Sequence, residues 1–170
     1  TDINWTALAA YYAYTDFASS AGFEPAALDV FPIKSYENFL GRFYTATGAQ
    51  ILKDNADSIL YYDVDSVNAC IVTMYSNNAT YNNRRLTYSE VSDTSNGYNV
   101  FLGGVASRFK ITTEQTNGKK ILVIGDTSAM PFVPFLTSDY QEVQLINPQY
   151  YKGDISAFVQ ENGFDDVLVM

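Results

Sequence analysis

The chain has 170 residues, 47% of them hydrophobic, which is enough for one domain with its own core. Nineteen acidic residues against ten basic ones give a formal net charge of -9. An acidic chain repels phosphate groups, so we expect no nucleic-acid partner and no attraction to anionic membrane surfaces, and no apolar run approaches the roughly 20 residues that span a bilayer.

The first third of the chain is predicted to begin with a helix over residues 6–21, where alanines are frequent and apolar side chains recur at helical spacing. Thr6 is a suitable N-cap for this helix, and Gly22 is a suitable stop. An edge strand is expected over residues 29–34, followed by a helical turn over residues 36–41.

The middle of the chain is predicted to consist of short strands, spaced as antiparallel hairpins. The expected strands are 58–63, 69–75, 80–88, 98–102 and 109–113, with a turn at 77–78 and a loop at 93–97. Asn117-Gly118 is typical of a tight hairpin turn, which would lead into the next strand. We interpret this region as a strand-containing insertion.

The last third changes character, because strand-like and helix-like segments alternate. The expected order is strand 121–124, helix 128–138, strand 142–146, helix 154–162 and strand 167–170. Such a βαβαβ unit is expected to be parallel and right-handed. The sequence therefore predicts an α/β fold, with a mainly parallel sheet flanked by helices.

Three polar residues follow the strand at 121–124, directly after Gly125. They are Asp126, Thr127 and Ser128. Ligands of open α/β sheets bind beyond the carboxyl ends of the strands, so these two hydroxyl groups are the first candidates for a site. A nucleophilic hydroxyl needs a base, however, and the sequence contains no histidine.

Five segments, taken in their order along the chain, resemble the DHHW protein family. They are Asp-Ile-Asn-Trp-Thr at 2–6 with the tyrosine-rich helix behind it, 38–44, Phe-Leu-Gly-Gly at 101–104, 124–136 and 146–151. Each segment is weak alone, and their shared order gives the resemblance its specificity.

This resemblance implies a fold and an activity. DHHW proteins are similar to the alginate O-acetyltransferases, whose fold is SGNH hydrolase-like, or flavodoxin-like. The chain is then expected to be one such domain over residues 1–170, corresponding to the later part of a longer family member. The implied chemistry is acyl transfer or deacylation on glycans by an exported or cell-surface bacterial protein, in which a serine attacks and a histidine oriented by an aspartate takes its proton.

Carried over residue by residue, the family site is degenerate in this chain. Asp2 matches the orienting aspartate, Asn4 falls at the position of the base, and Thr127 falls at the position of the nucleophile. An amide cannot accept a proton near neutral pH. The family's Asp-x-Arg-Tyr pattern is replaced by residues 147–150. Further positions that the resemblance brings toward the site are Asp126, Ser128, Gly104 and Gln149.

Two functions remain open. The chain is either a catalytically inactive domain that binds a cell-surface glycan or protein, or has a structural role, or it is a carbohydrate O-acetyltransferase or acetylesterase that uses Thr127 or Ser128 with an unrecognised base. Asp2 is a candidate for that base. Asp2 and Asn4 could also be simple caps of the first helix, which would carry no chemistry.

No cofactor or metal is expected. Cys70 is the only cysteine, which excludes an internal disulfide and a cysteine-based zinc site. Asp57, Asp63 and Asp65 are spaced too closely for a calcium loop and lack its glycine, so we interpret them as a solvated, turn-rich edge.

Paired tyrosines are a further feature of the sequence. They occur at 11–12, 61–62 and 150–151. Such pairs either line a sugar groove or lie half in the core and half at the surface.

Overall fold

The computed structural model describes residues 4–76, 78–90 and 94–170. Its helices are α1 (Ala7–Ser20), α2 (Gly41–Thr47), α3 (Gln50–Asp54) and α4 (Ile155–Asn162). Its strands are β1 (Ile33–Phe39), β2 (Asp57–Tyr62), β3 (Cys70–Tyr75), β4 (Thr80–Arg84), β5 (Arg108–Thr113), β6 (Lys120–Ile124), β7 (Glu142–Ile146) and β8 (Asp166–Val169). Short 3₁₀ turns cover Leu28–Val30, Val64–Ser66, Thr94–Val100, Thr127–Ala129 and Val133–Ser138.

Six strands form one sheet in the order β4-β3-β5-β7-β6-β8. Strand β6 is parallel to β7 and to β8, whereas β5 is antiparallel to β7, and β3 is antiparallel to both β5 and β4. The α/β class is confirmed, but the expectation of a mainly parallel sheet is wrong, because the sheet is mixed. Strands β3, β4 and β5 belong to this sheet and are not an insertion beside it.

The hairpin predicted at Asn117-Gly118 does not form, because β7 lies between β5 and β6. The Asn117 side chain instead accepts from the Lys119 N–H at 3.0 Å and donates to the Asp139 carbonyl at 2.7 Å. This Asx-type turn carries the chain across the end of β7 rather than back along β5.

The alternating last third is present in the order predicted. Asp154 caps α4 by accepting from the Ala157 N–H at 3.0 Å, and Gly163 ends the helix with φ 60°. The segment 128–138 forms two 3₁₀ turns instead of an α-helix. Pro131 and Pro134 explain this difference, since each removes a backbone N–H that an α-helix needs.

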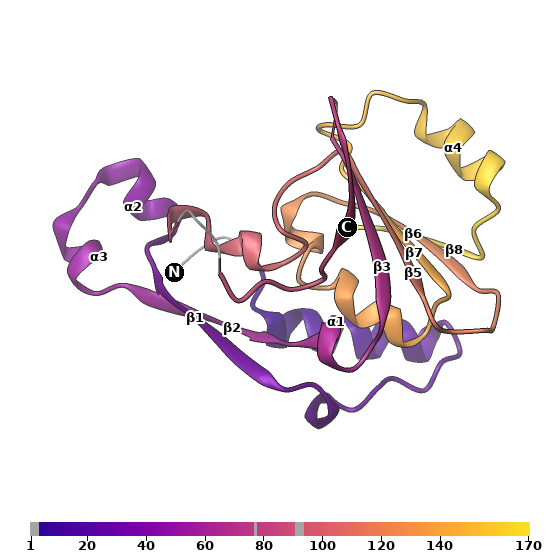
Figure 1. Cartoon of the computed structure of the whole chain (residues 1–170), viewed down its shortest axis with the longest axis horizontal. Coiled ribbons are helices and arrows are strands. Elements are labelled where there is room, and N and C mark those ends of the chain that lie inside the picture. The colour runs from indigo at the N-terminus through magenta and orange to yellow at the C-terminus, as the bar shows by residue number, and fades with distance from the viewer. Residues whose placement is uncertain (1–3, 77, 91–93) are drawn as a thin grey trace.

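Helix α1 covers one face of the six-stranded sheet, and α4 lies against the other (Figure 1). The predicted cap is confirmed, with Thr6 accepting from the Ala9 N–H at 3.1 Å. Tyr14 of α1 is fully buried and stacks on Phe135, with ring centroids 5.6 Å apart. On the far face, Phe158 of α4 lies 5.3 Å from the Arg108 guanidinium.

Strands β1 and β2 form a separate two-stranded antiparallel sheet, which Figure 1 shows leading away toward α2 and α3. The strand expected at 29–34 and the helical turn expected at 36–41 are both wrong, because Ile33–Phe39 is one continuous strand. Tyr36 and Phe39 from this strand are buried in the core, and this burial outweighs the local helix signal.

Three further expectations concern the chain between β3 and β5. The strand predicted at 98–102 is absent; a 3₁₀ turn covers Thr94–Val100, and Phe101 makes only an isolated bridge with Thr87. The turn at 77–78 and the loop at 93–97 include Asn77 and Asp93, which lie outside the described residues.

Candidate functional site

The site begins where β6 ends. The Gly125 N–H donates to the Ile146 carbonyl at 3.0 Å, which extends the parallel pairing by one bond. Asp126 then accepts from the Ser128 N–H at 2.8 Å and starts a single 3₁₀ turn. A Cβ at position 125 would lie 2.9 Å from the Ala129 Cβ, so only glycine fits this sharp turn.

Thr127 and Asn4 are brought together, although 123 residues separate them. The Thr127 Oγ1 donates to the Asn4 Oδ1 over 3.4 Å, and both residues are half-buried. The two sequence positions that the family resemblance assigns to nucleophile and base are therefore neighbours in space. Asp2, the third predicted member, lies outside the described residues.

The segment that carries Asn4 is held from a part of the chain that the sequence did not implicate. The Tyr98 hydroxyl donates to the Trp5 carbonyl at 3.2 Å, with the Asn4 carbonyl 3.5 Å away. Tyr98 is itself packed edge-on against Phe39, with centroids 5.9 Å apart. No motif in the sequence pointed to Tyr98, because its role depends on a contact across 93 residues.

A groove of about 480 Å³ opens beside Asn4. Most of its walls are apolar, as is usual for a small-molecule site. The lining residues are Asn4, Thr6, Ala7, Leu8, Phe39, Asp57, Ser58, Ile59, Leu60, Tyr62 and Tyr98. Five of them lie in β2, so the unexpected two-stranded sheet supplies much of one wall.

A second depression, of about 520 Å³, lies on the side of Ser128. Aromatic and aliphatic side chains from α1, from β8 and from Phe132, which precedes the 3₁₀ turn Val133–Ser138, contribute much of its lining. The full set is Trp5, Ala13, Phe17, Asp126, Ser128, Phe132, Leu168, Val169 and Met170. The two hydroxyl groups thus have different surroundings. Thr127 contacts Asn4 of the first groove, whereas Ser128 lines the second depression.

The other predicted positions lie in turns. Gly104 has φ 116°, and a Cβ there would lie 3.2 Å from the Asn99 Oδ1, so its backbone is suited to glycine alone. Gln149 is exposed in the turn after β7, and its N–H donates to the Asn147 Oδ1 at 3.0 Å. Neither residue hydrogen-bonds to Thr127 among the residues that the structure describes.

Among the described residues, no carboxylate or amine hydrogen-bonds to the Thr127 hydroxyl. Its side-chain partner is an amide, and the sequence has no histidine. Lys119 pairs with Asp165 at 3.0 Å, near the opposite end of β6. Within residues 4–76, 78–90 and 94–170, no three potential metal-ligating side chains gather into one site.

A comparison with protein-family models matches residues 1–146 to the DHHW protein family. The chain belongs to the DHHW family. Two solved structures are similar to this chain in fold. A DHHW family protein from Eubacterium siraeum has a TM-score of 0.84 and 25% sequence identity, with 99% of this chain and 56% of that one covered. PatB1 from Bacillus cereus, with a sulfonyl adduct, has a TM-score of 0.77 and 17% identity, with 98% and 57% covered.

The chain therefore spans a little more than half the length of the structures it matches. A second structure of Bacillus cereus PatB1 gives the same TM-score, with 99% of this chain and 60% of that one covered. No curated protein matches this DHHW chain. Among the described helices, none combines the length and apolar character needed to cross a membrane.

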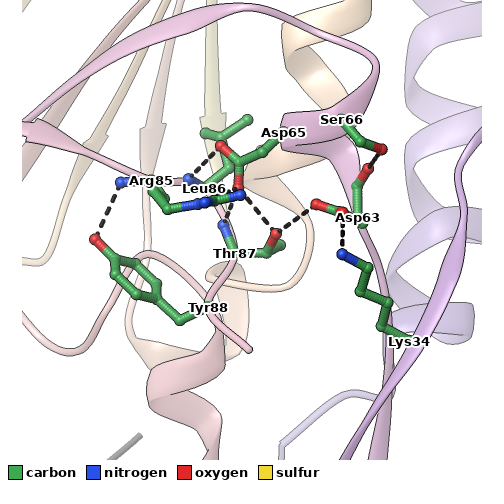
Figure 2. A network of polar contacts seen from close by, with 8 residues as sticks. All are labelled: Lys34, Asp63, Asp65, Ser66, Arg85, Leu86, Thr87 and Tyr88. Atoms are coloured by element: carbon green, nitrogen blue, oxygen red, sulfur yellow. Dashed lines mark hydrogen bonds and ion pairs between the residues drawn. The ribbon is translucent and has the colours of Figure 1, made fainter. Parts of the chain in front are cut away.

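The interpretation of the acidic group as a solvated edge holds for Asp57, which is exposed, but is wrong for Asp63 and Asp65, which belong to the network of polar contacts in Figure 2. Asp63 is 5% exposed, and Asp65 hydrogen-bonds to backbone N–H groups of Leu86 and Thr87. These two carboxylates are parts of a buried network, because the turn after β2 folds them inward against the segment that precedes the Thr94–Val100 turn.

Proposed function

We propose that this chain is a catalytically silent DHHW domain that binds a cell-surface glycan or protein partner in the groove beside Asn4. The observation that carries the proposal is the hydrogen bond from the Thr127 hydroxyl to an amide oxygen. In a working acyl-transfer site, that hydroxyl would donate to a group able to take its proton.

The chemistry of the pair supports inactivity. An amide oxygen orients a hydroxyl but does not deprotonate it near neutral pH. Loss of the base in a serine-type triad lowers turnover by roughly 10⁶-fold. Thr127 is also β-branched and stiffer than serine about χ1, which restricts its approach to an acyl carbon.

Three wider features belong to the same proposal. They are an SGNH hydrolase-like fold, a single domain that forms the later part of a longer protein, and export to the cell surface. Family membership and the likeness to PatB1, whose structure carries a sulfonyl adduct, support the first of these.

The second candidate function is a carbohydrate O-acetyltransferase or acetylesterase that uses Thr127 or Ser128. It is favoured by the position of both hydroxyls at the carboxyl end of β6, where Ser128 lines one depression and Thr127 contacts Asn4 of the first groove. Ser128 is the better placed of the two for an approach through the second depression, since it lines that depression itself.

Hydrolysis of p-nitrophenyl acetate separates the two candidates. We expect the rate to equal that of buffer, and to be unchanged in Thr127→Ala and in Ser128→Ala. A clear rate that one of these substitutions abolishes would assign the acetylesterase function instead and identify its nucleophile.

A further inference from the structure

The turn that leads from β5 toward β6 carries a reactive pair of residues that the proposed function does not use. Asn117 is followed directly by Gly118. Asparagine is thermolabile because the main-chain nitrogen of the next residue can attack its carboxamide carbon, Cγ. Glycine hinders this attack least, since it has no Cβ and reaches conformations that other residues avoid. The pair is therefore a candidate for self-modification.

The chain contains three Asn-Gly pairs, at 96–97, 117–118 and 162–163. As dipeptides they are identical, so any difference in reactivity must come from their surroundings. The Asn96 side chain lies outside the described part of the chain. Asn117 and Asn162 are described, and these two can be compared directly.

The Asn117 side chain is folded forward onto its own main chain. Its Oδ1 accepts from the Lys119 N–H at 3.0 Å, which turns the carboxamide toward the intervening nitrogen of Gly118. The Gly118 N–H has no hydrogen-bond partner among the described residues, and no atom lies within 4 Å of the place that a Cβ at 118 would take. Asn117 and Gly118 are both exposed, so water and hydroxide reach them.

The same hydrogen bond favours the chemical step. When the nitrogen attacks Cγ, negative charge develops on Oδ1, and this is the atom that already accepts from the Lys119 N–H. The other end of the carboxamide, Nδ2, donates to the Asp139 carbonyl at 2.7 Å. A side chain that is oriented in advance loses less entropy on the way to the transition state.

Asn162 lacks this arrangement. It is the last residue of α4, and its Nδ2 donates to the Phe158 carbonyl at 2.8 Å, one helical turn earlier. The carboxamide therefore points back along the helix and away from the Gly163 nitrogen. Among the described residues, no main-chain N–H donates to the Asn162 Oδ1.

We propose that Asn117 is a site of spontaneous deamidation in the folded protein. The Gly118 nitrogen gives its proton to hydroxide and bonds to the Asn117 Cγ. The bond from Cγ to Nδ2 then breaks, and Nδ2 takes a proton from water and leaves as ammonia. Water opens the resulting succinimide ring at Cγ, which gives aspartate, or at the main-chain carbonyl carbon, which gives isoaspartate. The net reaction converts a carboxamide and water into a carboxylate and ammonium, with no oxidation or reduction.

The modification weakens the turn in which it occurs. A carboxylate cannot donate to the Asp139 carbonyl, so the hydrogen bond at 2.7 Å is lost. Isoaspartate also lengthens the main chain just before β6, the strand whose far end carries Thr127. We therefore expect the modified chain to unfold at a lower urea concentration than the fresh chain. The inference is independent of whether the Thr127 site is silent.

The test is incubation of the folded chain at pH 6 and pH 8, followed by trypsin digestion and mass spectrometry. Trypsin cleaves after lysine and releases residues 111–119, in which Asn117 is the only asparagine, and residues 153–170, in which Asn162 is the only one. We expect the first peptide to convert at least about tenfold faster than the second, because only Asn117 has a donor at its developing oxyanion. Conversion should be faster at pH 8 and should give two products of equal mass, the aspartate and isoaspartate forms.

Unfolding is the matched control. In urea that unfolds the chain, both Asn-Gly pairs lose their surroundings, and we expect the two peptides to convert at similar rates. Asn117→Ser removes the carboxamide, while its hydroxyl oxygen is still able to accept from the Lys119 N–H, and the mass gain of the peptide 111–119 should disappear. A mass gain that persists in this variant would place the reaction at Gln115 and overturn the proposal.

Two further results would overturn it. One is a folded chain in which the peptide 111–119 stays unmodified or converts no faster than the peptide 153–170. The other is a difference between the two peptides that persists in the unfolded chain, because its cause would then be the neighbouring sequence and not the folded turn.

Discussion

Replacement of Asp139 by asparagine should stabilise the protein at neutral pH. Asp139 is 6% exposed, and its Oδ2 has no hydrogen-bond partner among the described residues. Burial raises the pKa of Asp139 from 3.8 to about 6, although a hydrogen bond from Tyr14 opposes the rise. Among the described residues no basic side chain pairs with the Asp139 carboxylate, so that part of the folded protein holds an uncompensated buried charge above pH 6.

The sign follows from proton binding. Between pH 3.8 and about 6 the folded state binds the Asp139 proton more tightly than the unfolded state, so stability falls as the pH rises. The contribution of Asp139 to the free energy of unfolding is fully present below pH 3.8 and is lost above the pKa of about 6 in the folded state. The pKa of Asp139 differs by about 2 units between the unfolded and folded states. At ~1.36 kcal/mol for each unit, this difference corresponds to about 3 kcal/mol of unfolding free energy. Asparagine has the shape of aspartate, but its amide is a further donor that needs a partner. We therefore expect the free energy of unfolding of Asp139→Asn to exceed that of the parent chain by about 1 to 2 kcal/mol at pH 8.

The assay is urea denaturation of the parent chain and Asp139→Asn at pH 4.5 and pH 8. The two proteins are compared by their difference in free energy of unfolding at each pH. This difference is used because other carboxylates make the free energy of unfolding depend on pH in the opposite direction. Glu142, for example, has a lowered pKa, with the ion pair to Lys110 and the Gln144 hydrogen bond outweighing burial. Asp29→Asn, which removes an exposed carboxylate, is the control for the loss of one negative charge and should not raise the free energy of unfolding at pH 8.

A stability gain in Asp139→Asn at pH 8 that disappears at pH 4.5 is the predicted result. Equal effects at both pH values would contradict this account, because they would show that the protonation state of Asp139 in the folded protein does not change between pH 4.5 and pH 8. A loss of stability at pH 8 would refute the reasoning outright.

Two further outcomes are expected. Asp65→Ala leaves the buried N–H groups of Leu86 and Thr87 without acceptors and should cost about 2 to 4 kcal/mol of unfolding free energy in urea denaturation; a cost below 1 kcal/mol would contradict the anchoring role of Asp65. The double variant Asn4→His with Thr127→Ser should keep the parent's thermal midpoint within a few degrees, since both sites are half-buried; loss of soluble protein would count against a relic of a catalytic pair at these positions.

The elements with strong local signals could be predicted from the sequence. Thr6 begins α1 and Asp154 begins α4, and each cap forms the hydrogen bond that its residue type favours. The pairing of β6 with β7 and β8 followed from the alternation of strands and helices. The contact between Thr127 and Asn4 was implied by the family resemblance, and no local pattern would have revealed it.

The remaining differences arise from long-range packing. Asn117-Gly118 has the composition of a hairpin turn, but the place of β7 between β5 and β6 is decided by contacts across the whole sheet. Likewise, no local sequence pattern predicts that Tyr36 and Phe39 are buried in a strand. The buried network of Asp63 and Asp65 was not predicted, because these residues have the spacing of surface residues and only the fold brings the segment 85–90 against them.

The most direct test of the silent Thr127 site is the intact mass of the chain after incubation with phenylmethylsulfonyl fluoride, which modifies activated hydroxyl nucleophiles. An unactivated Thr127, hydrogen-bonded to the Asn4 amide, should leave the mass unchanged. A stoichiometric adduct that disappears in Thr127→Ala or in Ser128→Ala would contradict the proposal, because it would show that a base activates one of these hydroxyls.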